Sequence, residues 1–371
     1  MPEQIIECVT RLYDNPDGLR FFTAFVFSEF GPEKANWFAD FELTKNVDGE
    51  VFFNKASEIY NRFFTDFGDV RDKLPPKPRV GATDAMRRLV KFKKDFAIMA
   101  SLDWFPRFLK SPFCQSLIER LDFVGDSGEE SLQYQLAQCA RFAPRDAGSW
   151  ISVFEIMADQ LDMCLTVSDM MQKQQPLIVV NQAFVDLTGY SREYCVGKNC
   201  RFLQGSETNK NAVKHIRASL ADGKDCYIGL INYKNKTKEQ FRNLLAVRPL
   251  IDRGGLYRYC LGVQFSMNSS PNVYHELYML DCLMKMLPFQ LEVMSHPDVL
   301  VGAEMKMFQE PVSCVKCHFS TIVTIIMRQY EDRCHNSMHS YVNIVSKSVF
   351  NCSNVLFLGK PCSNVVECFF Q

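Results

Sequence analysis

The 371-residue sequence has no apolar run of 18 or more residues, so no membrane-spanning helix is expected. Its first residues, Met-Pro-Glu-Gln-Ile-Ile-Glu, lack the charged and then apolar pattern of a secretory signal. Fifteen cysteines without such a signal indicate free thiols in a reducing compartment and no disulfide framework. We therefore expect a cytoplasmic protein.

The sequence also has almost no net charge, −1 at pH 7, which by itself selects no class of partner. The charge is uneven, however, because residues 71–110 hold eleven Lys or Arg, four Asp and no Glu. We expect no nucleic-acid partner, and oligomeric state is left open. A hydrophobic share of 47% with 31 Phe is ample for packed cores and excludes global disorder.

Residues 1–125 are predicted to form a helical domain, because apolar residues recur there at helical spacing. A basic helix is expected over about 82–101. A linker, 126–160, follows. Helices are predicted in it at 131–143 and at 149–163, and the second extends three residues into the next domain. The second of these helices has an apolar face made of Trp150, Val153, Phe154 and Met157.

From about 161 to 267 the pattern changes to that of an α+β domain. Strands are predicted at 161–167, 177–181, 225–233, 241–250 and 257–267. A helix at about 209–221 precedes the third strand. The predicted fold class is thus multidomain: an all-α bundle, then a domain with a five-stranded antiparallel sheet.

The C-terminal part divides into two segments. A helical extension is expected over 268–309, with a helix at about 273–287. Residues 310–371 hold six cysteines and little periodicity, so we expect a poorly ordered, Cys-rich tail.

The densest specific chemistry lies in Gly-Lys-Asn-Cys-Arg-Phe-Leu-Gln-Gly at 197–205. This stretch resembles the signature of LOV domains, blue-light sensors of the PAS superfamily that bind a flavin. The resemblance covers about 160–267 and includes Leu-Ile-Asn-Tyr at 230–233, Arg-Asn-Leu-Leu at 242–245 and Gly-Val-Gln at 262–264. It implies a PAS/LOV fold with FMN as cofactor.

The resemblance also implies a role for each polar residue of this region. Cys200 would be the nucleophile of a light-induced adduct, although a cysteine taken alone is most often an inert buried thiol. Arginine suits a flavin phosphate because it offers a planar fork of donors. The implied cofactor-binding residues are Asn199, Arg201, Gln204, Arg217, Asn232, Asn243 and Gln264.

The implied mechanism is a reversible bond between the Cys200 sulfur and the flavin C4a carbon. Protonation at N5 would then make Gln264 rotate its amide to keep a hydrogen bond. That change would bias a packed helix, either 149–163 or 273–287.

The N-terminal part resembles the RGS family of G-protein regulators over roughly 10–125. The resemblance rests on Asn-Pro-Asp-Gly-Leu-Arg-Phe-Phe at 15–22 and on the segment 103–111, among others. It implies contacts to the switch loops of a Gα subunit, which speed GTP hydrolysis. Asp103 and Arg107 match two contact positions, whereas Lys34 stands where an asparagine is usual.

The basic helix offers a different function. Anionic lipid attracts such residues at about 1 kcal/mol each near the surface, although many charged runs are only solvated faces. The residues are Arg87, Arg88, Lys91, Lys93 and Lys94.

RGS and LOV together resemble the RGS-LOV photoreceptors, some of which move to the plasma membrane in light. We expect light-regulated association with anionic membrane lipids and no enzyme activity. The alternative is light-regulated acceleration of GTP hydrolysis on a Gα subunit.

Two metal motifs near the C-terminus are discounted. Cys-Val-Lys-Cys-His at 314–318 matches a c-type haem attachment site, which belongs to export compartments. A zinc site from Cys314, Cys317, Cys334 and His335 or His339 has irregular ligand spacing. We predict no bound metal.

Overall fold

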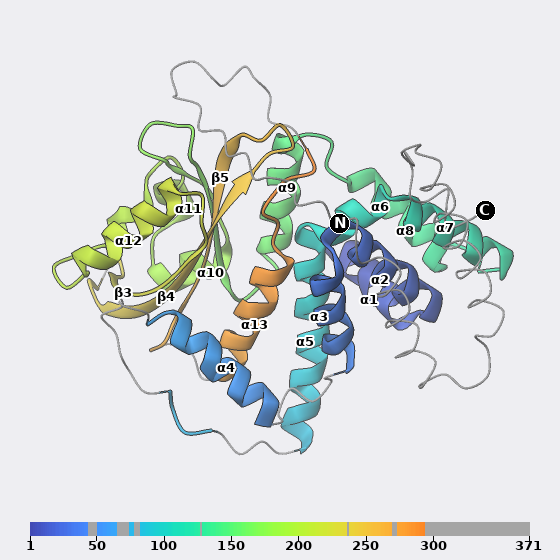
Figure 1. Ribbon diagram of the computed structural model, residues 1–371, viewed down its shortest axis with the longest axis horizontal. Coiled ribbons are helices and arrows are strands. Elements are labelled where there is room, and N and C mark those ends of the chain that lie inside the picture. The colour runs from blue at the N-terminus through green and yellow to red at the C-terminus, as the bar shows by residue number, and fades with distance from the viewer. Residues whose placement is uncertain are drawn as a thin grey trace, which may run out of the picture. The chain divides into compact units, whose positions relative to one another are not determined.

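The computed structural model describes residues 1–43, 50–64, 74–77, 82–126, 128–235, 237–268 and 273–293. The predicted tail, 310–371, and residues 294–309 of the predicted extension lie outside these ranges. Helices come first in the chain and a five-stranded sheet follows (Figure 1). The N-terminal helices are α1 (Pro2–Asp14), α2 (Pro16–Phe30), α3 (Pro32–Leu43), α4 (Glu50–Arg62), α5 (Ala82–Leu102), α6 (Trp104–Leu109) and α7 (Pro112–Phe123).

Two of these helices begin at a proline that follows a residue whose side chain caps the helix. The Asn15 side chain accepts a hydrogen bond from the Gly18 N–H at 2.8 Å, and Pro16 is the first residue of α2. Ser111 caps α7 in the same way, ahead of Pro112. Proline suits the first helical turn because its missing N–H would have no partner there.

Aromatic rings fill the core between these helices. The Phe22 ring lies 5.7 Å from that of Phe38 and 5.2 Å from that of Phe108. Phe38 stacks on Phe96 with the ring centroids 5.8 Å apart, and Trp104 is fully buried among them. The apolar residues that recur at helical spacing in the sequence therefore do form a helical core.

The strands form one antiparallel sheet in the order β2-β1-β5-β4-β3. All five predicted strands are present and the fold class is confirmed. Their bounds are β1 (Cys164–Asp169), β2 (Leu177–Val180), β3 (Cys226–Tyr233), β4 (Gln240–Ile251) and β5 (Tyr257–Ser266).

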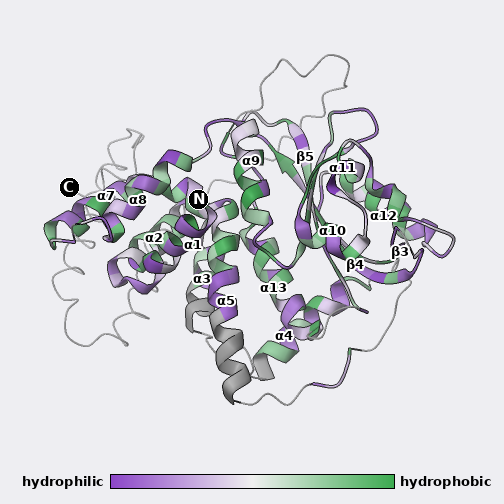
Figure 2. Cartoon of the chain, turned by 180° about the vertical axis from the view of Figure 1, so that it is seen from behind, coloured by the Kyte–Doolittle hydropathy of each residue, from purple (hydrophilic) through white to green (hydrophobic). Residues whose placement is uncertain are grey.

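The two faces of the sheet carry different neighbours, since successive strand residues point to opposite sides. On one face Leu165, Leu244 and Val263 join the large core that also contains residues of α9 (Ala147–Ala158) and α13 (Val273–Met286). Both helices are coloured mainly as hydrophobic in Figure 2, as burial requires. The other face carries α10 (Gln182–Thr188), α11 (Arg192–Cys195), the 3₁₀-helix η2 (Cys200–Leu203) and α12 (Lys210–Ala221).

The predicted linker packs against the N-terminal helices along its length. Helix α8 (Leu132–Cys139) contacts α1 and α7, a 3₁₀ turn η1 (Ala140–Phe142) follows, and α9 contacts α5. The predicted helix 149–163 ends early, at Ala158, because Asp159 turns to bind Arg192 at 2.9 Å and the Gln182 N–H at 2.8 Å. Within the described part of the chain, no helix is long and apolar enough to cross a membrane.

Candidate functional site

Asn199 holds the loop that presents Cys200. It is the N-cap of η2, and its Oδ1 accepts from the Arg201 N–H at 3.1 Å. Its Nδ2 donates to the carbonyl oxygens of Gln174 and Gln175, at 2.8 and 3.1 Å. Both glutamines have positive φ, 72° and 52°, which non-glycine residues rarely adopt. Asn199 therefore fixes the cysteine loop against the β1–β2 connection.

Cys200 is an exposed residue at the start of η2. Protein atoms around its sulfur nevertheless raise the pKa of the thiol by desolvation, while the Arg201 guanidinium acts in the opposite direction. A raised pKa keeps the thiol protonated at neutral pH, so the group needs a strong electrophile before it reacts.

A row of three buried amides crosses the sheet beside this loop. Asn243 on β4 donates through Nδ2 to Asn232 Oδ1 on β3, at 2.8 Å, and to Gln264 Oε1 on β5, at 2.6 Å. Asn232 Nδ2 in turn donates to the carbonyl oxygen of Leu203, at 3.2 Å, and so connects the row to η2. Three of the predicted cofactor residues are thus brought into direct contact.

One acceptor in this row has no partner. Asn243 is 1% exposed, and its Oδ1 accepts no hydrogen bond from any residue that the structure describes. A buried polar atom left unpaired costs about 1–3 kcal/mol, so it points to a ligand that donates to it.

The two predicted phosphate-binding arginines lie on the surface. Arg201 donates through Nε to Asn199 at 3.2 Å, and Arg217 lies on α12. Both are exposed, and neither forms an ion pair with a carboxylate among the described residues. Gln204 is exposed too and follows η2 directly.

Arginines without an acidic partner are suited to an anion, and the amide row is suited to the polar edge of a ring that both donates and accepts. The residues of this region therefore fit a flavin with a phosphate tail.

Comparison with known proteins agrees with this chemistry. A family model for the PAS domain matches residues 162–267. The chain is 40% identical over 111 residues to blue-light-activated histidine kinase 2 of Erythrobacter litoralis (strain HTCC2594), a match that covers 30% of this chain and 32% of that protein. Residues 162–267 are a LOV domain. The assignment supports the predicted FMN cofactor.

Other similar proteins match the same part of the chain. Phototropin-2 of Oryza sativa subsp. japonica is 36% identical over 106 residues, which are 29% of this chain and 12% of that protein. A solved structure of the LOV domain from the Erythrobacter litoralis EL346 blue-light activated histidine kinase is 40% identical to this chain. The match covers 29% of this chain and 97% of the solved chain, with a TM-score of 0.28.

The chain spans about a third or less of the length of these curated relatives, so their activities are not transferred to it. One relative is named as a histidine kinase, and the absence of enzyme activity in this chain stays a prediction.

The two predicted Gα contacts bind each other. Arg107 Nε lies 3.0 Å from both carboxylate oxygens of Asp103, and Nη1 lies 2.8 Å from Glu29 Oε1. Its Nη2 donates to the carbonyl oxygen of Gln290, which follows α13. Asp103 is 3% exposed, and burial raises the pKa of its carboxyl group to about 6 against the lowering effect of Arg107. The RGS resemblance and the Gα contact remain predictions.

Lys34, which stands where the RGS family usually has an asparagine, lies close to this network. Its ammonium group is 4.8 Å from the centre of the Phe30 ring and 5.9 Å from that of Trp104. Burial lowers the pKa of Lys34 to about 8.

The basic helix corresponds to α5, and two of its described lysines, Lys91 and Lys93, make ion pairs. Lys91 Nζ lies 2.7 Å from Asp95 Oδ2 and 2.9 Å from Asp162 Oδ2, in the turn before β1. Lys93 pairs with Asp14 at 3.2 Å. Lys94 is exposed, and the side chains of Arg87 and Arg88 lie outside the described residues.

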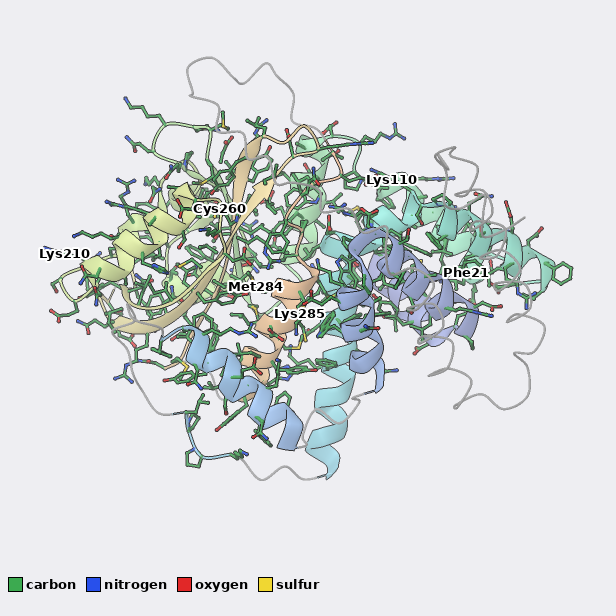
Figure 3. All side chains as sticks on the ribbon, viewed as in Figure 1. Phe21, Lys110, Lys210, Cys260, Met284 and Lys285 are labelled. Atoms are coloured by element: carbon green, nitrogen blue, oxygen red, sulfur yellow. The ribbon has the colours of Figure 1, made fainter. Side chains whose placement is uncertain are left out.

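The sequence analysis missed Arg248, a buried arginine in the middle of β4. Its Nη2 lies 2.6 Å from Asp225 Oδ2, and its Nη1 donates to the carbonyl oxygens of Met284 and Leu287. Met284 and the next residue, Lys285, lie on α13 (Figure 3). Lys285 Nζ lies 2.6 Å from Asp281 Oδ2. An arginine in the otherwise apolar run Leu-Ala-Val-Arg-Pro-Leu was the available signal.

A second missed residue, Cys260, shares the site. It lies on β5 (Figure 3). Its side chain is buried, with 6% exposed. Burial, and then the nearby Cys200 sulfur, raise the pKa of its thiol. Among the described residues no group of His, Cys, Asp or Glu is arranged to hold a metal, while the zinc candidates Cys314 to His339 lie outside them.

Proposed function

We propose that this chain is a blue-light sensor whose photochemistry takes place at Cys200. When bound, FMN supplies the light-absorbing ring and, once excited, the carbon that the Cys200 sulfur attacks. The single observation that carries the proposal is the amide row of the LOV domain, in which Asn243 Oδ1 is buried without a partner among the described residues.

The roles of the other residues follow from their positions. Arg201 and Arg217 hold the phosphate through charge-assisted hydrogen bonds. Asn232 and Asn243 hold the polar edge of the ring, and Asn199 keeps the Cys200 loop in place. The thiol stays protonated in the dark because its pKa is raised, so its proton is available to move when the sulfur reacts.

We propose that Gln264 couples the change at the flavin site to the rest of the sheet. In the structure its Oε1 accepts from Asn243 Nδ2. If its amide rotates in response to a new donor in the site, an NH₂ group faces Asn243 and that hydrogen bond is lost. The loss reaches Leu203 through Asn232, and it reaches the far face of the sheet through Val263 and Phe265, which belong to the core shared with α9 and α13.

The output that we propose is release of the exposed lysines of helix α5 from their ion pairs, so that they can bind anionic lipid. The ion pair of Lys91 with Asp162 supports this, because Asp162 lies two residues before β1 and β1 pairs with β5 at Gln264. In this proposal the loss of the Gln264 hydrogen bond shifts Cys164, its partner on β1, and with it the turn whose Asp162 holds Lys91. The apolar face of α9 is covered in this state, since Phe154 and Met157 are fully buried.

The photochemical part is tested by an absorption spectrum of the purified full chain before and after a blue pulse, with Cys200→Ala alongside. We expect a structured flavin band that bleaches and recovers in the wild type only. A protein without bound flavin, or bleaching that persists in the variant, would overturn the proposal.

The output is tested by sedimentation with vesicles that contain or lack an anionic lipid, in the dark and in light. Lys93→Gln with Lys94→Gln should weaken light-state binding roughly 30-fold, at about 1 kcal/mol per charge. Asp162→Asn should raise dark-state binding, and Lys210→Gln, on α12, is the matched control. Normal bleaching without vesicle binding in either light condition would leave the sensor and refute the lipid output.

A further inference from the structure

Helix α4 belongs to the N-terminal part of the chain but packs against α13 and the LOV sheet. Among the described elements α13 is its main packing partner, and the two helices lie side by side in Figure 1. The centre of the Phe52 ring lies 5.0 Å from that of Tyr278, and the centre of the Phe53 ring lies 5.0 Å from that of Tyr274. Two aromatic pairs thus join the first turn of α4 to α13.

An ion pair with a buried carboxylate holds the same two helices together. Arg62 Nη1, at the end of α4, lies 3.2 Å from Asp281 Oδ1 on α13. Asp281 is buried, and Lys285 on its own helix binds its other oxygen. A buried charge needs partners of opposite charge, and α4 supplies one of them through Arg62.

The C-terminal end of α4 reaches the free edge of the sheet. Strand β3 is the last in the order β2-β1-β5-β4-β3, so one side of its backbone has no neighbouring strand among the described residues. There the Gly229 N–H donates to the Phe63 carbonyl oxygen at 3.1 Å. The fully buried Phe63 ring lies 5.7 Å from that of Tyr227. Because an open strand edge can pair with other chains, the end of α4 protects β3 at this point.

Glycine at position 229 allows this close approach. A Cβ atom there would lie 2.9 Å from Phe64 Cε1 and 3.4 Å from Phe64 Cζ. Carbon atoms in contact normally stand about 3.5–4.0 Å apart, so a larger side chain would push against the Phe64 ring. Glycine weakens the interior of a strand and often marks a place where another segment comes close. The signal in the sequence is the glycine within Cys-Tyr-Ile-Gly-Leu-Ile at 226–231.

The same strand carries one end of the amide row. Asn232, three residues after Gly229 on β3, accepts a hydrogen bond from Asn243 on β4. Gly229 itself pairs with Leu244, the residue that follows Asn243. A shift of β3 against β4 at the amide row therefore also moves the N–H group that binds α4.

We propose that residues 50–64 are a latch, which closes on the β3 edge in the dark and opens in blue light. The light step rests on the function proposed above, whereas the closed contact at Gly229 does not. In light the hydrogen bond between Asn243 and Gln264 is lost, β3 shifts, and the Gly229 N–H separates from the Phe63 carbonyl oxygen. Opening uncovers the edge of β3 and the apolar face of α4.

Hydrogen exchange of the full chain, measured by mass spectrometry in the dark, tests the closed contact. Gly229→Val should raise exchange over 50–64 about tenfold, the effect of losing roughly one hydrogen bond with its packing. Exchange over 257–266, on β5, should stay as in the wild type. Phe64→Ala in the Gly229→Val background removes the ring that the new side chain meets, and it should restore slow exchange.

Two further variants keep this test independent of a folding defect. Gly229→Ala adds the smallest possible side chain and should give a smaller rise over 50–64 than Gly229→Val. Ile231→Val, two residues further on the same side of β3, is the matched control and should leave exchange over 50–64 unchanged.

The light step is tested on the same preparations with a blue pulse. Exchange over 50–64 should rise in the wild type and stay unchanged in Cys200→Ala. The latch is overturned if Gly229→Val leaves exchange over 50–64 unchanged in the dark, or if Phe64→Ala fails to restore it. It is also overturned if the wild type bleaches normally and 50–64 stays protected in light. A preparation that binds flavin without bleaching would refute the photochemical proposal and the light step with it, while the dark comparison still decides the closed contact.

Discussion

Asn243 donates a hydrogen bond to Gln264 across strands β4 and β5 at 2.6 Å, and both side chains are buried. Among the described residues, the Asn243 NH₂ group has two acceptors, Gln264 Oε1 and Asn232 Oδ1. If the Gln264 amide rotates, Asn243 on the next strand therefore loses a hydrogen-bond acceptor. The predictions below begin with this pair.

Gln264→Leu should uncouple light from output. The Asn243 NH₂ group loses one acceptor, at a cost of about 1–3 kcal/mol in the free energy of unfolding. The bleaching that depends on Cys200 should persist, and light-dependent vesicle binding should be lost. Bleaching and vesicle sedimentation measured on one preparation check this. Leu245→Met, a conservative change opposite Gln264 on β4, is the control.

Cys200→Ser should abolish bleaching at little cost in stability. The residue is exposed, and surface changes usually alter the free energy of unfolding by less than about 0.5 kcal/mol. Urea unfolding and the absorption spectrum of the same sample measure the two effects. A variant that bleached like the wild type would show that another group forms the adduct. Cys260, a thiol close enough to Cys200 for the two groups to interact electrostatically, is the candidate.

Arg201→Gln and Arg217→Gln should each weaken the binding of FMN. A charge-assisted hydrogen bond contributes about 1.5–3 kcal/mol, which corresponds to a roughly 10- to 150-fold rise in Kd. Fluorescence titration of the apoprotein with FMN measures this, with riboflavin as the ligand that lacks a phosphate. Lys214→Gln removes the same charge from α12 and should have a small effect. Equal losses for FMN and riboflavin would contradict a phosphate role.

Arg248→Met should loosen helix α13 from the sheet. It removes the donors to the Met284 and Leu287 carbonyl oxygens and the partner of Asp225, which we expect to cost about 3 kcal/mol. Urea unfolding gives the total, and hydrogen exchange over 273–287 shows whether the loss is local. Lys224→Met breaks an exposed pair with Asp222 and should change the free energy of unfolding by less than about 1 kcal/mol.

Asp103 should make the free energy of unfolding depend on pH in a direction unusual for a carboxyl group. Its pKa in the folded protein, about 6, lies above the ordinary value of 3.8, so the folded state binds the proton more tightly. The stabilisation is complete below pH 3.8 and is lost as pH rises through 6, by an amount of order 1–3 kcal/mol. Urea unfolding at pH 4 and 6.5 should show a smaller fall for Asp103→Asn than for the wild type.

Asp222→Asn is the control for this pH dependence, since that carboxylate is exposed. A wild-type difference that Asp103→Asn leaves unchanged would show that other carboxyl groups cause it.

The positions of the strands and of the Cys200 motif could be predicted because their signals are local. Alternating apolar residues mark β3, β4 and β5 to within about a residue, and the motif at 197–205 identifies its own loop. Helix ends were harder. The predicted helix over 149–163 is wrong beyond Ala158, because Arg192 and Gln182, about 30 and 20 residues further along, determine where Asp159 turns.

The sequence by itself determined the helical and sheet-forming parts, the LOV domain and the residues that fit a flavin, because those depend on spacing within one strand, helix or loop. Only the tertiary structure decided which side chains meet. It brought Lys91 to Asp162, and it brought Arg248 to the carbonyl oxygens of Met284 and Leu287, contacts between residues 36 to 71 positions apart. Such contacts arise when helices and strands bury their apolar faces against one another, and no pattern within a single segment encodes them.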